Sequence, residues 1–139
     1  MFLALTTVGC DEALSSIMGP TPNLEPTFSS IQREIFQSGD SSGRSACTSC
    51  HIPGGVGVRT GGLDLSPAAA YSQLVNVPAR RNPAVLRVVP GDPENSFLIH
   101  KLEGRPGTGN RMPDDGPPFL TKGQIRIIKR WIEIGAPNN

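Results

Sequence analysis

The residues best suited to chemistry are two cysteines and a histidine in the segment Cys47-Thr48-Ser49-Cys50-His51. Their pattern is C-x-x-C-H, which is typical of covalent attachment of a c-type haem. Two thiols spaced in this way on one helical turn can each add to one vinyl group of the same porphyrin. The imidazole of the next residue can then ligate the iron. The motif predicts thioether bonds at Cys47 and Cys50, with His51 as the proximal iron ligand.

Other chemistries of paired cysteines fit this sequence less well. A redox-active dithiol of the thioredoxin kind requires a βαβ context, and no strand-like run stands near the motif. A structural zinc site requires four ligands, usually supplied by two paired clusters. The other Cys and His residues are Cys10 and His100, and they form no second cluster. The sequence therefore favours haem over a zinc ion or a dithiol.

The second axial ligand has two candidates, Met112 and His100. Met112 precedes Pro113 in the glycine- and proline-rich segment 105–119, and a thioether ligand is normally presented on a rigid loop of this kind. The span from His51 is long enough for the chain to reach the opposite haem face. A methionine that only packs on the haem edge is another interpretation. We expect Met112 to be the distal ligand, with His100 as the alternative.

The composition indicates a loop-rich domain with a thin core. The 139 residues include 16 glycines and 14 prolines, while aromatic residues make up only 5%. A bound haem would supply apolar surface that such a chain lacks. The net charge of +1 argues against nucleic acid as a partner. Residues 80–139 carry ten basic against six acidic side chains, which could steer an acidic redox partner or form an ordinary solvated surface.

The first ten residues resemble the end of a bacterial lipoprotein signal. An apolar run and small residues precede Cys10, which would carry the lipid. The positively charged start of such a signal is missing, and Thr7 stands where leucine is usual. A plain free thiol is the alternative, although it would be a liability in an oxidising compartment. We expect residues 1–10 to be the signal remnant, with a lipid anchor on Cys10.

After this signal, we expect a tether followed by one domain. Residues 11–26 contain proline turns and little periodicity, which predicts a flexible tether. The domain is then residues 27–139. Its helical signals are apolar faces of helical period with caps or terminating glycines, and they fall at residues 28–37, 63–75, 92–103 and 121–134.

The first and last of these segments should pack across each other. In the first, Phe28 and Ile31 lie on the apolar face, with Gln32 on the polar side. The last opens with a capping box at Thr121 and Gln124. The stretches in between, among them residues 52–57 and 76–91, are expected to be irregular. The second stretch contains three arginines that could pair with haem carboxylates, Arg80, Arg81 and Arg87.

Three further strings extend the match beyond the C-x-x-C-H motif. They are VPGDPENSFL at residues 89–98, RMP at residues 111–113, and a last segment from Leu120-Thr121 through Trp131-Ile132 to Gly135-Ala136. Together they resemble a bacterial monohaem cytochrome c domain of the planctomycete and myxobacterial kind. The resemblance implies an all-α cytochrome c fold, with about four short helices and long loops wrapped around one covalently attached haem c.

The function that the resemblance implies is outer-sphere electron transfer through this haem, with His51 and Met112 as axial ligands. The location would be the outer side of a bacterial plasma membrane, where c-type haems are attached. Redox proteins, or a membrane respiratory or photosynthetic complex, are the expected partners. No substrate pocket is indicated, so we expect an electron carrier rather than an enzyme. The alternatives are a haem-bearing subunit of a larger membrane redox complex, and a haem sensor or peroxidase with a labile sixth site.

Overall fold

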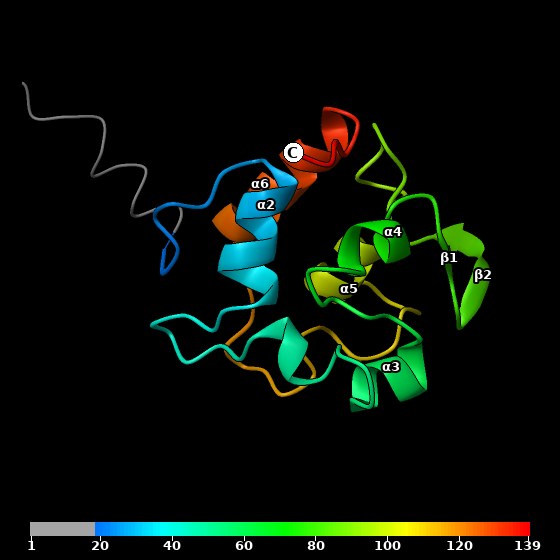
Figure 1. The fold of residues 1–139 in the computed structure, drawn as a ribbon, viewed down its shortest axis with the longest axis horizontal. Coiled ribbons are helices and arrows are strands. Elements are labelled where there is room, and N and C mark those ends of the chain that lie inside the picture. The colour runs from blue at the N-terminus through cyan, green and yellow to red at the C-terminus, as the bar shows by residue number, and fades with distance from the viewer. Residues whose placement is uncertain (1–18) are drawn as a thin grey trace, which may run out of the picture.

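The structure is a computed structural model and describes residues 19–139. Figure 1 shows short elements joined by long irregular segments. In chain order the elements are α2 (Phe28–Ile31), η1 (Gln32–Phe36), η2 (Cys47–Ser49), α3 (Val56–Gly61), α4 (Ala70–Leu74), β1 (Pro78–Ala79), β2 (Asn82–Leu86), α5 (Phe97–Glu103) and α6 (Lys122–Glu133). Of these, η1 is a π-helix that continues α2, and η2 is one turn of 3₁₀-helix.

A β-hairpin lies within the stretch 76–91, for which the sequence predicts irregular structure. Its strands β1 and β2 are antiparallel, with Pro78 paired to Leu86. Prolines in both strands conceal the hairpin, because they suggest a loop. Pro83 is tolerated in β2 because it lies exposed in a two-stranded sheet, where every strand is an edge. The expected all-α cytochrome c fold is therefore wrong, since the described residues combine short helices with a sheet.

The core forms where the first helical segment crosses α6, and this confirms one sequence prediction. The ring centroids of Phe28 and Trp131 lie 5.5 Å apart. Figure 1 shows α6 passing close behind α2. The same core cluster contains fully buried aliphatic side chains from both segments, and they are Ile31, Ile35, Ile128 and Ile132. The crossing fixes the scaffold from which the C-x-x-C-H segment departs.

The capping box predicted at the start of α6 is present and extends into a buried polar network. The Thr121 hydroxyl accepts from the backbone N–H of Gln124 at 3.2 Å, and the Gln124 side-chain oxygen Oε1 accepts from the Thr121 N–H at 2.8 Å. The Gln124 amide also donates to Thr21 and Asp40, at 3.1 and 3.3 Å. Because Thr21 is buried, packing of the described chain already begins within residues 11–26.

A buried ion pair closes the loop between η1 and the C-x-x-C-H segment. The Arg44 Nε lies 2.9 Å from Asp40 Oδ2, and the two side chains are 0% and 2% exposed. The guanidinium also donates to the carbonyl oxygens of Ile35 and Ser38, at 3.3 and 3.0 Å. These bonds satisfy carbonyl groups at the end of the first helical segment. The residues just before Cys47 are therefore fastened to that segment.

The N-terminus of α2 is capped from a distant part of the chain. The amide N–H of Phe28 donates to Asn139 Oδ1 at 3.0 Å, and that of Ser29 donates to the Asn139 carbonyl oxygen at 2.8 Å. The Thr27 hydroxyl accepts from the Ser30 N–H at 3.3 Å. Three of the amide groups that an α-helix leaves unsatisfied at its start therefore have acceptors.

Candidate functional site

The C-x-x-C-H segment forms one tight turn. The amide nitrogens of Cys50 and His51 donate to the carbonyl oxygen of Cys47, at 3.2 and 3.0 Å. Both cysteines are free thiols, and they lie on a single helical turn as the spacing predicts. Cys47 is half-buried and Cys50 is exposed. The turn therefore presents two thiols and an imidazole within one short backbone segment.

The imidazole of His51 is held by a backbone carbonyl. Its Nδ1 lies 3.0 Å from the carbonyl oxygen of Leu63, and the amide of Leu65 donates to the His51 carbonyl oxygen at 2.8 Å. When Nδ1 donates to Leu63, the neutral ring keeps a lone pair on Nε2. Nε2 makes no hydrogen bond to any residue within the described range 19–139. This arrangement prepares Nε2 to ligate a metal.

Helix α3 packs against this ring at a glycine. A Cβ atom added to Gly57 would lie 2.5 Å from His51 Nδ1 and 2.7 Å from Cε1. The Gly57 amide donates to the Cys50 carbonyl oxygen at 2.9 Å, which fixes α3 directly after the turn. The expectation that residues 52–57 are irregular is therefore wrong for the last two, which begin α3. The close approach leaves no room for a side chain at position 57.

The two thiols of the turn differ in their surroundings. Burial raises the pKa of the Cys47 thiol to about 11, although the charge of Arg44 acts in the opposite direction. The Cys47 sulfur lies 3.5 Å from the carbonyl oxygen of Ile35 and packs against the core. Cys50, in contrast, is exposed to solvent. The pair therefore consists of one protected and one accessible thiol.

We expect iodoacetamide to alkylate Cys50 well before Cys47 in the haem-free chain. With a pKa of about 11, Cys47 has a thiolate fraction at neutral pH about a hundredfold below that of an ordinary cysteine. Mass spectrometry of peptides after timed quenching measures both rates. In urea the difference should disappear, because unfolding exposes both thiols equally. Equal rates without urea would contradict the described burial of Cys47.

Met112 stands in a loop that is anchored to α5 at Met112 itself and at the preceding residue. Its amide donates to the carbonyl oxygen of Lys101 at 2.9 Å. The preceding Arg111 donates through Nε to the carbonyl oxygen of Leu102 at 2.8 Å, and its guanidinium lies 4.3 Å from the ring centroid of Phe119. The Met112 side chain is half-buried against the core. The loop therefore holds the thioether in a defined position.

The Met112 loop and the C-x-x-C-H turn are neighbours in space. The hydroxyl of Ser45, just before the turn, donates to Asp115 Oδ2 at 2.6 Å, across 70 positions of sequence. The charge of Asp115 also acts on the Cys47 thiol. Figure 1 shows the segment that leads into α6 running beside the short helix before α3. The structure therefore brings together the two segments that carry the predicted ligands.

His100, the alternative second ligand, is engaged with the backbone. Its Nε2 lies 2.6 Å from the carbonyl oxygen of Glu94, and its ring is edge-on to Phe97 at 6.2 Å between centroids. The Glu94 carboxylate pairs in turn with Arg105 and Lys129, between α5 and α6. Because Nε2 of His100 is already occupied, these contacts favour Met112 as the second ligand.

Of the arginines considered for haem carboxylates, Arg87 is committed to the backbone. Its side chain is buried, and burial lowers its pKa. Its guanidinium donates to three carbonyl oxygens, those of Gln73, Gly61 and Gly62, at 2.8, 3.3 and 3.0 Å. Arg80 and Arg81 lie exposed at the hairpin tip, where Arg80 donates to the Arg59 carbonyl oxygen at 3.3 Å. The two tip residues therefore stay candidates.

Gln32 is a part of the site that the sequence prediction missed. The pattern puts it on the polar side of segment 28–37, yet it is only 7% exposed. Its Nε2 donates to the carbonyl oxygen of Leu65 at 2.9 Å. Gln32 lies four residues after Phe28 and four before Phe36, and residues four apart share one face of a helix. Ordinary helical spacing therefore places it on the buried face, and its assignment to the polar side is wrong.

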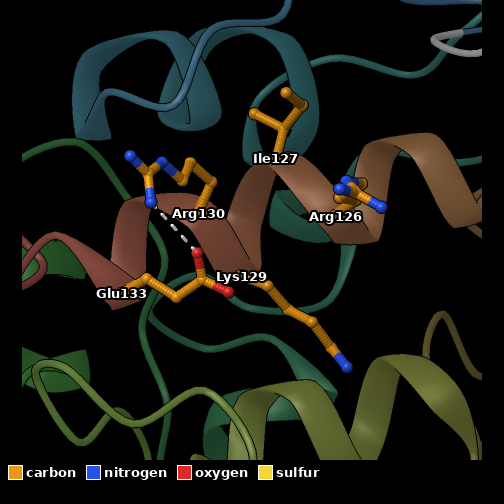
Figure 2. A pocket seen from close by; sticks show the side chains of 5 residues that line it. All are labelled: Arg126, Ile127, Lys129, Arg130 and Glu133. Carbon is orange, nitrogen blue, oxygen red and sulfur yellow. Dashed lines mark hydrogen bonds and ion pairs between the residues drawn. The ribbon is translucent and has the colours of Figure 1, made fainter.

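A surface depression on α6 lies apart from these residues. Figure 2 shows its five lining side chains along α6, with Ile127 and Lys129 pointing in opposite directions, and they are Arg126, Ile127, Lys129, Arg130 and Glu133. Arg130 pairs with Glu133 at 3.4 Å, and Lys129 pairs with Glu94 and Glu103 at 2.7 Å each. The depression is therefore largely charge-compensated, and it contains none of the predicted site residues.

Cys10, the predicted lipid attachment residue, lies outside the described residues. Within residues 19–139, no helix has the length and apolarity needed to cross a membrane. In the same range, no three His, Cys, Asp or Glu side chains gather into a group that could hold a metal ion. Comparisons with family models, curated proteins and solved structures found no match for the chain.

Proposed function

We propose that the chain is a monohaem electron-transfer protein that acts on the outer side of a bacterial membrane. Cys47 and Cys50 would hold the haem through thioethers, and His51 Nε2 and Met112 Sδ would be the axial ligands. One observation carries the proposal more than any other. The bond from His51 Nδ1 to the Leu63 carbonyl oxygen leaves Nε2 without a partner among residues 19–139, directly beside two free thiols on one turn.

The residues of this site fit a c-type haem. Their donor set is two thiols, an imidazole and a thioether, and it is the set that His/Met-ligated c-type haems use. The half-buried Met112 and Cys47 both pack against the same apolar core. The turn and the loop are joined by the bond between Ser45 and Asp115. Donors of the required kinds are thus present in adjacent segments.

When bound, the haem supplies one-electron chemistry at the iron. The chain contributes a fixed ligand set, because a carrier works best when its ligands stay in place in both oxidation states. The Leu63 carbonyl and Gly57 confine the His51 ring from two directions. The amide bond from Met112 to Lys101 confines the other ligand. A thioether opposite an imidazole favours the reduced state and raises the reduction potential.

The test of this proposal is the optical spectrum of Met112→Ala. The protein is produced with a c-type haem maturation system, and covalent haem is verified by staining after denaturing electrophoresis. We expect the wild-type ferric protein to show a methionine-to-iron charge-transfer band that is absent from Met112→Ala. The reduced variant should bind carbon monoxide readily, because its sixth site is open, whereas the reduced wild type should not.

His100→Gln is the matched control, since it removes the competing candidate ligand without touching the Met112 loop. Its spectrum should keep the charge-transfer band. If the band survives in Met112→Ala and disappears in His100→Gln, the ligand assignment is wrong. If no covalent haem is found on Cys47 and Cys50, the proposed function itself fails. Ready binding of carbon monoxide by the wild-type protein would favour a sensor or peroxidase instead.

A further inference from the structure

The carbonyl that holds His51 belongs to an irregular segment, residues 63–65, which needs support from elsewhere. Leu65 returns a hydrogen bond to the His51 carbonyl oxygen at 2.8 Å. The Asp64 amide donates to Gln73 Oε1 at 2.8 Å, and the Leu65 carbonyl oxygen accepts from Gln32 Nε2 at 2.9 Å. Two glutamine side chains therefore hold the segment, one from α4 and one from η1.

Gln32 is the more unusual of the two. It is buried to 7% exposure, and its Oε1 is the one buried side-chain acceptor among the described residues without a hydrogen-bond partner. A buried unpaired acceptor destabilises a fold, so a chain gains nothing in stability from keeping it. The backbone bond from the Gln37 amide to the Gln32 carbonyl oxygen, at 2.9 Å, closes a π-turn that begins at Gln32. Such π-turns occur frequently at functional sites.

We propose that Gln32 is a positioning residue for His51, acting through residues 63–65, and this rests on the proposed function. By holding the Leu65 carbonyl, it keeps the Leu63 carbonyl oxygen against the imidazole Nδ1. That hydrogen bond raises the basicity of the ring and so strengthens Nε2 as a ligand. Gln32 therefore tunes the iron site although it lies on the far side of the segment that contacts the histidine.

Removing the side-chain amide of Gln32 should shift the reduction potential of the haem in a defined direction. In Gln32→Met, a side chain of similar size fills the same space but cannot donate to Leu65. The segment 63–65 relaxes, and the bond between Leu63 and His51 weakens. A less basic imidazole donates less charge to the ferric iron, so the reduction potential becomes more positive. The same change exposes the Nδ1 proton of His51 to exchange with solvent.

The experiment compares the haem-loaded wild type with Gln32→Met and Gln32→Asn. Asparagine keeps the amide but is too short to reach Leu65, so it serves if the methionine variant folds poorly. We expect a more positive potential in both, and loss of the slowly exchanging His51 Nδ1 proton signal from the NMR spectrum of the reduced protein. Gln124→Met is the control, because it removes another buried glutamine that bonds Thr21 and Asp40. Gln124→Met should lower the melting temperature but leave both the reduction potential and the His51 Nδ1 proton signal unchanged.

The outcomes separate the inference from the function on which it rests. Haem staining comes first, and an unstained wild-type protein overturns both. A stained wild type, together with folded Gln32 variants whose potential and proton signal match it, overturns the positioning role alone. An equal shift of the reduction potential in Gln124→Met would also overturn the positioning role of Gln32, because general destabilisation would then explain the shift. A shift confined to the Gln32 variants supports it.

Discussion

We expect Asp40→Ala to lower the free energy of unfolding by about 3–5 kcal/mol, because it leaves a buried guanidinium without its counter-charge. Arg44 and Asp40 are 0% and 2% exposed in their side chains, and the atoms that join them are 2.9 Å apart. The arginine cannot lose its proton, so the charge stays in the core. Chemical denaturation followed by circular dichroism measures the loss.

The expected loss is large because Asp40 serves two helices. Its Oδ2 accepts from Arg44, which satisfies the end of η1, and from Gln124, which belongs to the capping box of α6. The control is Glu133→Ala, which breaks the exposed pair with Arg130 and should change stability by less than about 0.5 kcal/mol. Similar losses in the two variants would show that burial of the Asp40 pair carries no special weight.

The Asp40 carboxylate should make the free energy of unfolding depend on pH in the acid range. Burial alone would raise the pKa of Asp40, but hydrogen bonds from Ser42, Gln124 and Arg44 outweigh it and hold this pKa below its ordinary value. Its contribution is therefore present above the unfolded pKa, about pH 4, and is lost as the pH falls through the lowered folded value. In that acid range, the stability of Asp40→Ala should fall less steeply than that of the wild type.

Gly57→Ala should destabilise the protein by about 1–3 kcal/mol, the usual cost of forcing an extra methyl into a filled space. The new Cβ would lie 2.5 Å from His51 Nδ1, so the ring must move and its bond to Leu63 must break. In the haem-loaded protein, we expect part of the ferric population to become high-spin as His51 is displaced. Denaturation and the ferric optical spectrum measure the two effects.

Gly61→Ala is the matched control in the same helix. A Cβ at Gly61 meets no atom within 4 Å, and alanine is a better helix former than glycine. This variant should therefore stabilise the protein by about 0.5–1 kcal/mol and leave the spectrum unchanged. If the two variants change the free energy of unfolding in opposite directions, the difference comes from the contact between position 57 and His51. Stabilisation by both would contradict the close packing at position 57.

Local signals in the sequence were sufficient for some parts of the fold. The capping box at Thr121 and Gln124 is a short-range motif whose partners lie one turn apart, so it is present where the pattern puts it. Gly104 ends α5 with a φ of 69°, as a terminating glycine should. The start of α5 was placed too early, at Asp92. That carboxylate caps a separate turn by accepting from the Asn95 amide at 3.1 Å.

Other parts depend on contacts between distant segments, which spacing cannot show. The hairpin is held by Arg87, whose guanidinium reaches backbone carbonyls of two earlier segments. The bond from the Gln32 side chain to the Leu65 carbonyl oxygen likewise joins residues that lie 33 positions apart. At the site, the C-x-x-C-H motif predicts haem chemistry, and its spacing predicts that both thiols lie on one turn, as they do. The carbonyl of Leu63 could not be found in the same way, because every residue offers a backbone carbonyl.

The cap that Asn139 places on α2 has a consequence for the order of folding. The bond from Phe28 to Asn139 spans 111 positions, and the Phe28 ring also needs Trp131 beside it. Contacts of such long range form late, because the chain must close a large loop before it gains them. We expect the core against which Cys47 packs to stay open in a nascent chain until α6 has reached α2. If a haem is attached as proposed, both cysteines are accessible in the interval before that packing.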